Sequence, residues 1–333
     1  MNASPPTPQA WRIVARRTGG PEVLEREDVP LPEPGPGEVR VRNVAIGVNY
    51  IDTYHRSGLY PLTLPTGLGS EAAGVVEKLG EGVTGVVPGQ RVACLPGRPP
   101  GAYATHMVVS VDSLFALPDT IGEDIAAAAM LKGVTTWMLV ERCARIEPGQ
   151  TVLVHAAAGG VGSLAVQWLK AVGATVIAHA GNDAKAARAK SLGADHALSC
   201  PFDELADTVR ALTGGRGVDA VLDGVGKASW TASLASIARR GMMVSYGNAS
   251  GPPPAIAPLE LNRAGSLFLT RPSMYDYIDT ARARAQAGAR LFAMLESGKV
   301  KVEISQHFPL ARAADAHRAL EARATTGSTI LLP

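Results

Sequence analysis

The alternation of apolar and polar residues changes character near Pro148 of the 333-residue chain. From Trp11 to about Arg145, short stretches such as residues 38–49 alternate in part and are separated by turns rich in proline and glycine. Short alternating stretches are typical of β-strands with one buried face. The first part of the chain is therefore predicted to be a compact, mostly β domain.

After Pro148 the chain repeats a cycle of strand, glycine-containing turn and helix. The strand candidates are residues 151–156, 175–180, 196–199, 218–223 and 241–247, and the helix candidates are residues 163–172, 183–192, 202–214 and 227–240. Strands that alternate with helices at this spacing are typical of parallel sheets. The fold class is predicted to be α/β, with a doubly wound sheet.

A third segment begins after residues 266–270, where the chain becomes helical again and then ends in a last strand, STILLP. We predict a first domain at 1–130, an inserted doubly wound domain at 131–265, and a return to the first domain at 266–333. Two domains suit this length, because single cores rarely grow beyond about 250–300 residues. A cleft between the domains is the expected small-molecule site.

Charge and hydropathy exclude several classes of partner. The 32 Lys and Arg nearly balance the 30 Asp and Glu without a block of one sign, so neither nucleic acid nor an anionic membrane is expected as a partner. The segment 151–169 is nearly as long as a membrane-spanning helix, which needs about 20 apolar residues. Polar and glycine residues divide it into strand, turn and helix, which argues against a span.

The cysteines and the N-terminus indicate the compartment. Cys94, Cys143 and Cys200 are far apart and form no Cys-x-x-Cys pair, which is typical of a reduced, disulfide-free chain. Nothing in their surroundings marks one of them as an activated nucleophile. Residues 1–17 lack the apolar core of a signal peptide, so we expect a cytoplasmic protein.

Residues 67–74, GLGSEAAG, match the spacing of a dinucleotide-binding turn through Gly67, Gly69 and Ala72. Such a turn must follow a strand and open a helix whose amides face a phosphate. This segment instead follows prolines and precedes sequence with strand character. We predict that it does not bind the dinucleotide.

The segment HAAAGGVG meets the same requirement, because it lies between the strand candidate that ends at His155 and a helix. Small residues there let backbone amides approach a pyrophosphate, and the last glycine lets helix and strand pack closely. The predicted dinucleotide-binding residues are Ala157, Gly159, Gly160, Val161 and Gly162. The alternative is a glycine-rich turn that binds nothing.

The end of the next strand selects between NAD and NADP. An acid there would bind the ribose hydroxyls of NAD and repel the 2′-phosphate of NADP, but this strand ends at Ala180. Lys185 and Asn182 offer a cation and a neutral donor to that phosphate. Asp183 weakens the case unless it caps the following helix, and Lys185 is alternatively a solvated surface residue. NADPH is the favoured cofactor.

Six segments in order along nearly the whole chain, IGVNYIDTYHRSGLYP, GLGSEAAG, LKGVTTW, HAAAGGVG, MVSYGNASG and LTRPS, closely resemble the zinc-independent NADPH:quinone oxidoreductases. These form the zeta-crystallin branch of the medium-chain dehydrogenase/reductase superfamily. The resemblance implies a GroES-like β domain joined to a Rossmann domain, and a homodimer paired through the Rossmann domains.

The resemblance also gives a reason for GLGSEAAG. Zinc alcohol dehydrogenases carry Gly-His-Glu at the matching place, and its histidine binds zinc; here Ser70 replaces the histidine. Asn49 and Lys132 stand where those relatives have the two cysteine ligands, and the four-cysteine lobe is reduced to Cys94. Tetrahedral zinc sites need thiolate and imidazole ligands, so no metal is expected.

The seven histidines show no spacing that suggests another metal site. His55, His106, His155, His179, His196, His307 and His317 include no pair at i, i+3 or i+4. Scattered in this way, they are expected to be packing or surface residues.

Without a metal, the acceptor must delocalise its own charge, as a quinone does when its reduced anion becomes an aromatic phenolate. By resemblance, Tyr60 matches the proton-donating tyrosine of enoyl-thioester reductases, and Tyr54 and Asn49 match residues of the nicotinamide pocket. The alternative for each tyrosine is a packing role. Asp52 is expected to be a structural hydrogen-bond acceptor.

Further cofactor positions come from the resemblance and from strand ends. Thr135, placed at a helix opening, and Tyr246 with Asn248 match cofactor-side positions, and Gly224 lies after the fourth strand, where ligands bind in such sheets. One departure is Cys200, where many relatives carry a tyrosine against the adenosine phosphate. Either Phe202 replaces that tyrosine or the face is open.

Three functions are therefore compatible with the sequence. The first is an NADPH-dependent quinone reductase, and the second is an enoyl-thioester or enone reductase that uses Tyr60 as proton donor. The third is a crystallin-like protein that holds NADPH with little turnover.

Overall fold

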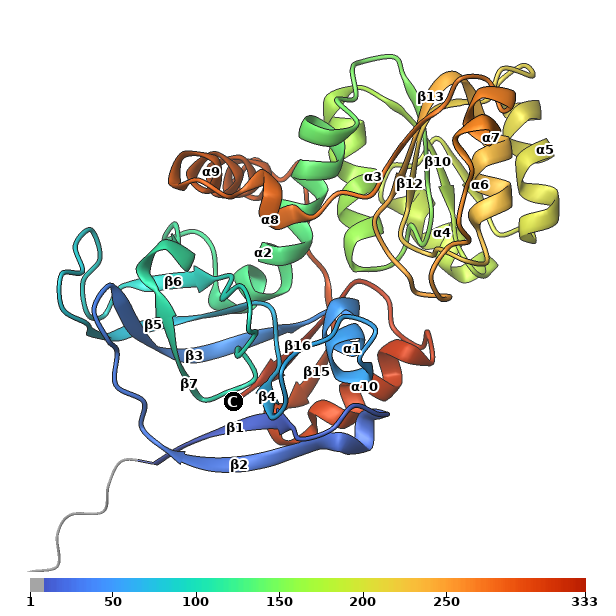
Figure 1. Cartoon of the computed structure of the whole chain (residues 1–333). Helices are drawn as coiled ribbons and strands as arrows, with labels where there is room; N and C mark the ends of the chain where they lie inside the picture. Colours follow the sequence, from blue (N-terminus) through green and yellow to red (C-terminus); the bar gives the residue numbers. More distant parts are fainter. Residues whose placement is uncertain (1–8) are drawn as a thin grey trace, which may run out of the picture. The chain divides into compact units, whose positions relative to one another are not determined.

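The chain forms two compact units, shown in Figure 1 as a computed structural model that describes residues 9–333. One unit runs to Leu131 and resumes at Val302–Pro333, and the other is Lys132–Lys301. Residues 1–8, the start of the N-terminus in which we expect no signal peptide, lie outside the described residues. Within residues 9–333 no helix is both long and apolar enough to cross a membrane.

The first unit is built on β-strands. They are β1 (Gln9–Ala15), β2 (Leu24–Pro30), β3 (Glu38–Val48), β4 (Thr66–Gly67), β5 (Ala72–Leu79), β6 (Arg91–Cys94), β7 (His106–Ser110), β8 (Leu114–Ala116), β15 (Ile304–Pro309) and β16 (Ser328–Leu332). The larger, seven-stranded sheet has the order β15-β16-β3-β5-β6-β8, with β7 also paired to β3, and the smaller one has the order β2-β1-β4. The prediction of a mostly β first domain is confirmed.

Strand β3 shows why this unit folds around a sheet. Its residues Val39, Val41 and Asn43 are buried on one face, while their neighbours are partly or fully exposed. From Ala45 to Val48 every residue is buried. This second half is covered on both faces, so the apolar run there is continuous.

Short helices complete the first unit. They are α1 (Tyr50–Ser57), α10 (Ala313–Glu321) and the 3₁₀ turns η1 (Pro21–Val23), η2 (Val111–Ser113) and η4 (Leu310–Arg312). A longer helix, α2 (Glu123–Trp137), begins in the first unit and ends in the second.

The segment GLGSEAAG connects β4 to β5 and opens no helix, as expected. Gly69 has φ +92°, and a Cβ there would lie 2.3 Å from the ring of Tyr103. This glycine is required by the left-handed backbone and by the close approach of an aromatic ring.

The second unit holds a six-stranded sheet. Its strands are β9 (Thr151–Val154), β10 (Thr175–His179), β11 (His196–Leu198), β12 (Val218–Asp223), β13 (Ile237–Ser245) and β14 (Phe268–Thr270). Their order is β11-β10-β9-β12-β13-β14, and every neighbouring pair is parallel. The predicted doubly wound sheet is confirmed, and its strand order reverses between β9 and β12, where such sheets bind ligands.

Helices cover both faces of this sheet. The helices of this unit are α3 (Gly160–Val172), α4 (Asp183–Ser191), α5 (Phe202–Leu212), α6 (Trp230–Ser236), α7 (Pro258–Arg263), α8 (Met274–Tyr277), α9 (Ala281–Glu296) and the π-helix η3 (Met138–Cys143), of which α8 and α9 lie away from the sheet (Figure 1). Figure 1 shows α3 on one face, with α5 and α6 on the other.

The structure differs from the sequence-based expectation at two places. Residues 266–301 stay in the second unit, because β14 pairs with β13, and the return begins at Val302 instead of residue 266. The helix predicted over 227–240 is shorter: α6 ends at Ser236, and Ile237 already starts β13. Ile237 pairs with Val218 of β12, and after a shift in register the pairing resumes at Met242, so the strand begins before the irregular segment ends.

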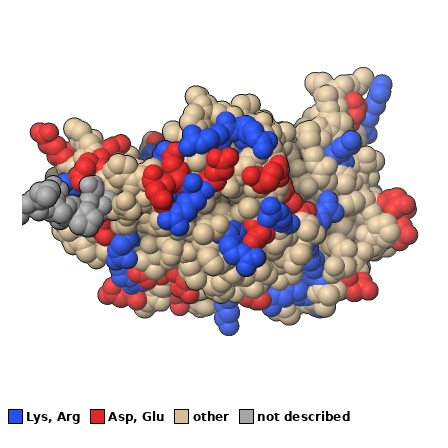
Figure 2. All heavy atoms as spheres, turned by 90° about the horizontal axis from the view of Figure 1, so that it is seen from below, with Lys and Arg blue, Asp and Glu red and all other residues tan. Residues whose placement is uncertain are grey.

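Surface charges of both signs are interspersed. On the face drawn in Figure 2, Lys and Arg lie among Asp and Glu without forming one broad patch. In the β1–β2 ribbon, for example, Glu27 accepts from Arg12 at 2.7 Å and from Arg16 at 2.6 Å. Each such exposed pair contributes little to stability, about 0–1 kcal/mol.

The turn between β9 and α3 depends on one close contact. A Cβ at Gly162 would lie 2.2 Å from the carbonyl oxygen of Ala156 and 2.8 Å from Cα of Ala157. Both are backbone atoms, so neither can move without shifting the turn. Gly162 therefore allows α3 to pack directly against the end of β9.

We expect Gly162→Ala to lower the free energy of unfolding by about 1–3 kcal/mol, the range for an overpacked site. The clash outweighs the higher helix propensity of alanine, which is worth at most about 1 kcal/mol. Urea unfolding followed by circular dichroism measures the change. Gly101→Ala is the matched control, because its Cβ would meet nothing within 4 Å; equal stability of the two variants would contradict the prediction.

Candidate functional site

The predicted dinucleotide turn lies at the N-terminal end of α3. Gly159 is the N-cap, and Gly160, Val161 and Gly162 form the first turn. The N–H of Ala157 donates to the carbonyl of His179 at 3.1 Å, so this residue shapes the turn. The first helical amides have no intrahelical acceptor, and with the helix dipole they form a site suited to a phosphate.

Three further predicted residues meet at the carboxyl ends of β12 and β13. A Cβ at Gly224 would lie 2.9 Å from the hydroxyl of Tyr246. The N–H of Tyr246 donates to the carbonyl of Asp223 at 2.8 Å, and Ala249, next to Asn248, donates to the carbonyl of Gly224 at 3.2 Å. The structure therefore brings Gly224, Tyr246 and Asn248 together beside the strand-order reversal.

A buried carboxylate holds the loop after β12. Asp223 is fully buried, and its Oδ1 accepts from the N–H groups of Val225 at 2.7 Å and Gly226 at 3.1 Å. Its Oδ2 accepts from the hydroxyls of Ser229 and Ser233, each at 2.7 Å. Four donors compensate the burial of the charge, so Asp223 positions the loop that contains Gly224.

Two histidines and a phenylalanine pack at the ends of β9 and β10. The rings of His155 and His179 are 5.4 Å apart, and Phe202 lies 5.7 Å from the first and 4.9 Å from the second. His155 Nε2 bonds Ser233 Oγ at 2.8 Å, and burial lowers the pKa of His155 to about 4. Phe202 thus packs inward on these imidazoles, close to Cys200, whose carbonyl accepts from His179 Nε2 at 2.9 Å.

The cofactor-selecting loop follows β10. Asn182, not Asp183, is the N-cap of α4, and its Oδ1 accepts from the N–H of Lys185 at 2.9 Å. The carboxylate of Asp183 instead accepts from the hydroxyl of Ser199. The negative charge that weakened the case for NADPH is therefore hydrogen-bonded toward β11.

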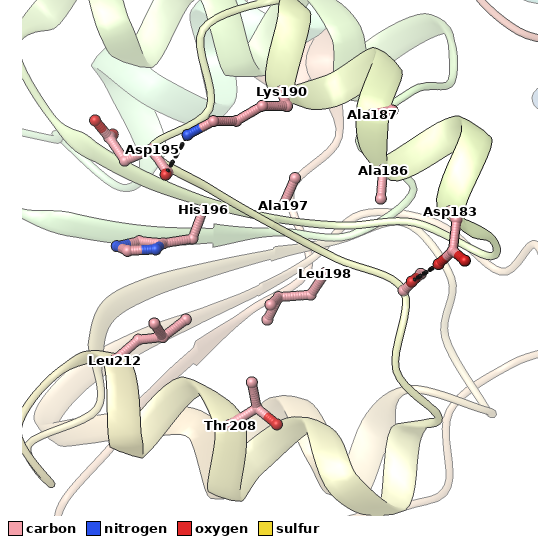
Figure 3. A pocket seen from close by; sticks show the side chains of 11 residues that line it. Asp183, Ala186, Ala187, Lys190, Asp195, His196, Ala197, Leu198, Thr208 and Leu212 are labelled. Carbon is pink, nitrogen blue, oxygen red and sulfur yellow. Dashed lines mark hydrogen bonds between the residues drawn. The ribbon is translucent and has the colours of Figure 1, made fainter.

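A groove of about 550 Å³ lies between α4 and α5 over the edge strand β11 (Figure 3). Asp183 and Ser199 line one end, and Lys190, whose ammonium donates to the carbonyl of Asp195 at 2.7 Å, lines another part. None of the predicted catalytic residues lines it.

Thr135 corrects one prediction. It lies near the end of α2 and not at a helix opening, because α2 starts at Glu123. Its hydroxyl contacts the sulfur of Met274 at 3.7 Å. The helical pattern of residues 123–134 is the feature of the sequence that could have indicated a position late in the helix for Thr135.

In the first unit, Asn49 is tied to a buried carboxylate. It is the N-cap of α1, and its Nδ2 donates to Glu71 Oε1 at 2.8 Å. Glu71 Oε2 also accepts from the N–H of Leu131. Asn49, at the position where the resemblance implies a zinc-binding cysteine in other enzymes, thus donates a hydrogen bond to a carboxylate.

Ser70 is tied to the second buried carboxylate. Its hydroxyl donates to Asp52 Oδ1 at 2.6 Å, while Asp52 Oδ2 accepts from Tyr103 at 3.1 Å and from the N–H of Asn49 at 2.9 Å. Tyr103 also bonds His317 Nε2 at 3.0 Å. Asp52 is therefore the structural acceptor that we predicted.

Burial dominates the electrostatics of this network. It raises the pKa of Asp52 to about 6, against the lowering effect of its hydrogen bonds, and raises the pKa of Tyr103. Burial and the nearby Arg56 guanidinium lower the pKa of His317 to about 3. The imidazole is therefore neutral, and Arg56 lies 3.1 Å from its Nδ1.

The donors present do not match a zinc site. Ser70 and Asn49 supply a hydroxyl and an amide, and Lys132 lies buried on α2. Among residues 9–333 no group of three or more His, Cys, Asp or Glu is arranged to hold a metal ion. Cys94, Cys143 and Cys200 are unpaired, and burial raises the pKa values of Cys94 and Cys143.

The predicted catalytic tyrosines form an aromatic cluster on α1 and the segment after it. Tyr54 is 8% exposed, and its ring contacts that of Tyr60 edge to face at 5.2 Å and that of Tyr50 at 6.0 Å. Tyr60 is half-buried, and its ring lies 6.3 Å from that of His55. Both predicted roles, packing and contact with a ligand, remain open to Tyr60.

Several side-chain contacts in these networks were not predicted from the sequence. His155 and His179 meet because neighbouring parallel strands end together, although 24 positions separate them. His317 joins Tyr103 from α10, at the far end of the chain. Only the position of each histidine at the end of a strand candidate could have indicated the first pair.

The sequence is similar to known oxidoreductases along nearly its whole length. Residues 35–119 match the alcohol dehydrogenase GroES-like domain, and residues 160–291 match the zinc-binding dehydrogenase family. The chain is 48% identical to a quinone oxidoreductase of Pseudomonas aeruginosa, over 97% of this chain and 100% of that protein. It is 41% identical to a 2-haloacrylate reductase of a Burkholderia species, over 96% and 98% of the two chains.

Solved structures give the same result. The Escherichia coli quinone oxidoreductase complexed with NADPH superimposes with a TM-score of 0.94 at 43% identity, covering 97% of this chain and 100% of that one. The quinone oxidoreductase of Pseudomonas syringae gives 0.94 at 48% identity with the same coverage. The resemblance inferred from the sequence is confirmed: the chain belongs to the quinone oxidoreductases of the medium-chain dehydrogenase/reductase superfamily.

Proposed function

We propose that this protein is an NADPH-dependent quinone reductase that works without a metal ion. The observation that carries the proposal is the hydrogen bonding of Asn49 to Glu71 and of Ser70 to Asp52, where zinc-dependent relatives have ligands. Relatives named as quinone oxidoreductases, one of them solved with NADPH, support it.

The unit Lys132–Lys301 is the one we assign to NADPH, which supplies a hydride from its nicotinamide ring when bound. The amides at the start of α3 bind the pyrophosphate, and the tight turn at Gly162 keeps them aligned. Lys185, in the first turn of α4, meets the 2′-phosphate. Gly224, Tyr246, Asn248 and Thr135 line the remainder of the dinucleotide site.

The first unit provides the groups for the acceptor. A quinone delocalises the charge it receives, so it needs hydrogen-bond donors and no Lewis acid. The carboxamide of Asn49 and the phenols of Tyr54 and Tyr60 are such donors. Asp52 and Glu71 act indirectly, because they hold the start of α1 through Asn49 and Ser70.

Two other functions remain as alternatives. An enone or enoyl-thioester reductase would use Tyr60 as proton donor, and the 2-haloacrylate reductase relative favours this reading because its name denotes a conjugated acid as substrate. A crystallin-like protein would bind NADPH and turn over little. The unpaired cysteines support a reducing compartment, which we infer to be the cytoplasm.

We expect the purified chain to oxidise NADPH with 9,10-phenanthrenequinone at least tenfold faster than with a crotonyl thioester, measured at 340 nm. Tyr60→Phe then separates the two chemistries. If Tyr60 only lines the pocket, quinone turnover stays within about threefold, whereas a true proton donor to an enolate costs about a hundredfold or more.

Tyr50→Phe is the matched control, because Tyr50 donates to the carbonyl of Leu320 at 3.3 Å in the same aromatic cluster. Turnover of the thioester alone would contradict the quinone proposal. Tight NADPH binding without turnover of either acceptor would favour the crystallin-like alternative.

The cofactor preference depends on Lys185. We expect Lys185→Ala to weaken NADPH binding about tenfold and to leave NADH binding within twofold, because a charged hydrogen bond to phosphate contributes about 1.5–3 kcal/mol. Fluorescence titration with both cofactors measures this. Lys190→Ala on the same helix is the control, since Lys190 bonds Asp195; an equal loss for NADPH and NADH would refute the role.

A homodimer formed through the second units is the assembly that we propose. Strand β14 is one of the two edges of the sheet. Phe268 on this strand is 59% exposed, and Leu259 on α7 is 55% exposed. A twofold axis beside β14 would pair two copies of this strand and cover both side chains.

We expect Phe268→Asp to convert a dimer into a monomer in light scattering, while Val87→Asp, at another exposed site, has no effect. A wild-type monomer at all concentrations would exclude this assembly.

A further inference from the structure

His55 is a buried side chain without a hydrogen-bond partner. It lies on α1 and is 4% exposed, and among the described residues neither of its ring nitrogens has a partner. The other buried histidines each have at least one: His317 bonds Tyr103, His179 bonds the carbonyl of Cys200, and His155 bonds Ser233. A buried polar group left unpaired destabilises the fold, and an aliphatic residue would pack there without that cost.

The imidazole is neutral in this position. Burial and, to a smaller extent, the positive charge of Arg98 together lower the pKa of His55 to about 4. A neutral imidazole has one N–H donor and one lone-pair acceptor. Its natural complement is an uncharged oxygen that accepts a hydrogen bond as a carbonyl, or that donates one as a hydroxyl.

His55 lies beside the residues that we assign to the acceptor. Its ring is 6.3 Å from that of Tyr60, which in turn contacts Tyr54 at 5.2 Å. Tyr60 is only half-buried. Rotation of Tyr60, at the loss of its edge-to-face contact with Tyr54, is the access route to the imidazole that the proposal below requires.

We propose that His55 binds an oxygen of the acceptor beneath Tyr60 and so determines the preference for quinones. This rests on the proposed function. A quinone has two carbonyl oxygens, and one of them accepts from the imidazole N–H. After reduction the same oxygen is a hydroxyl, which donates to the ring once the imidazole presents its lone pair. An enoyl thioester has a single carbonyl and lacks this second oxygen.

The test compares His55→Leu with His55→Gln. Leucine fills the space without polar atoms, whereas the glutamine amide retains a donor and an acceptor. We expect His55→Leu to raise KM for 9,10-phenanthrenequinone about tenfold, with kcat and the Kd for NADPH within twofold. Its thermal midpoint should equal or exceed that of the wild type, because an unpaired polar group has been removed. His55→Gln should restore KM to within about threefold of the wild type.

Direct binding separates this proposal from the proposed function. Calorimetry of the quinone with the chain saturated by NADP⁺ involves no turnover, and we expect His55→Leu to weaken this binding about tenfold. If the wild type binds the quinone but does not reduce it, the proposed reductase function is refuted, while the role of His55 in quinone binding still stands. Unchanged KM and affinity in His55→Leu, or no quinone binding to the wild type, would overturn the proposal. A lowered thermal midpoint in His55→Leu would also overturn it, since it would show a structural hydrogen bond.

Discussion

The close approach of α3 to the end of β9 is the constraint on which the second unit depends. A Cβ at Gly162 would come within 2.2 Å of the Ala156 carbonyl oxygen, so only glycine lets the first turn of α3 lie directly against the strand. This contact determines where the helical amides point. Helix α3 covers one face of the sheet, opposite α5 and α6 (Figure 1). The neighbouring loops are then held by Asp223, whose four donors make a buried charge tolerable.

In the first unit, two buried carboxylates need hydrogen-bond donors. Asp52 and Glu71 would carry a large desolvation cost if they were unpaired, and Ser70, Tyr103, Asn49 and the Leu131 amide supply the hydrogen bonds. Two of these donors, Ser70 and Asn49, stand at positions where the family resemblance implies zinc ligands in zinc-dependent enzymes. The same local framework therefore stabilises the start of α1, next to the residues that we propose for the acceptor.

The fold and the turn between β9 and α3 were accessible from the sequence because both are local. Strand and helix periodicity, and the spacing of Ala157, Gly159 and Gly162, depend on neighbours within a few residues. The predictions that needed correction depend on distant pairing. Residues 237–240 have a helical pattern but join β13, and residues 266–301 stay in the second unit because β14 completes its sheet. Local propensity is a weak signal where a long-range strand partner is present.

The sequence by itself determined the two-domain α/β architecture and the turn between β9 and α3, and by resemblance it predicted that Ser70 and Asn49 replace zinc ligands. Only the tertiary structure decided which side chains are paired. It joined Tyr103 to His317 and His155 to His179, and within residues 9–333 it gave the two ring nitrogens of His55 no hydrogen-bond partner. Hydrogen bonding is directional and acts over about 3 Å, so it depends on the approach of segments that lie far apart in the chain. No pattern within a single segment records that approach.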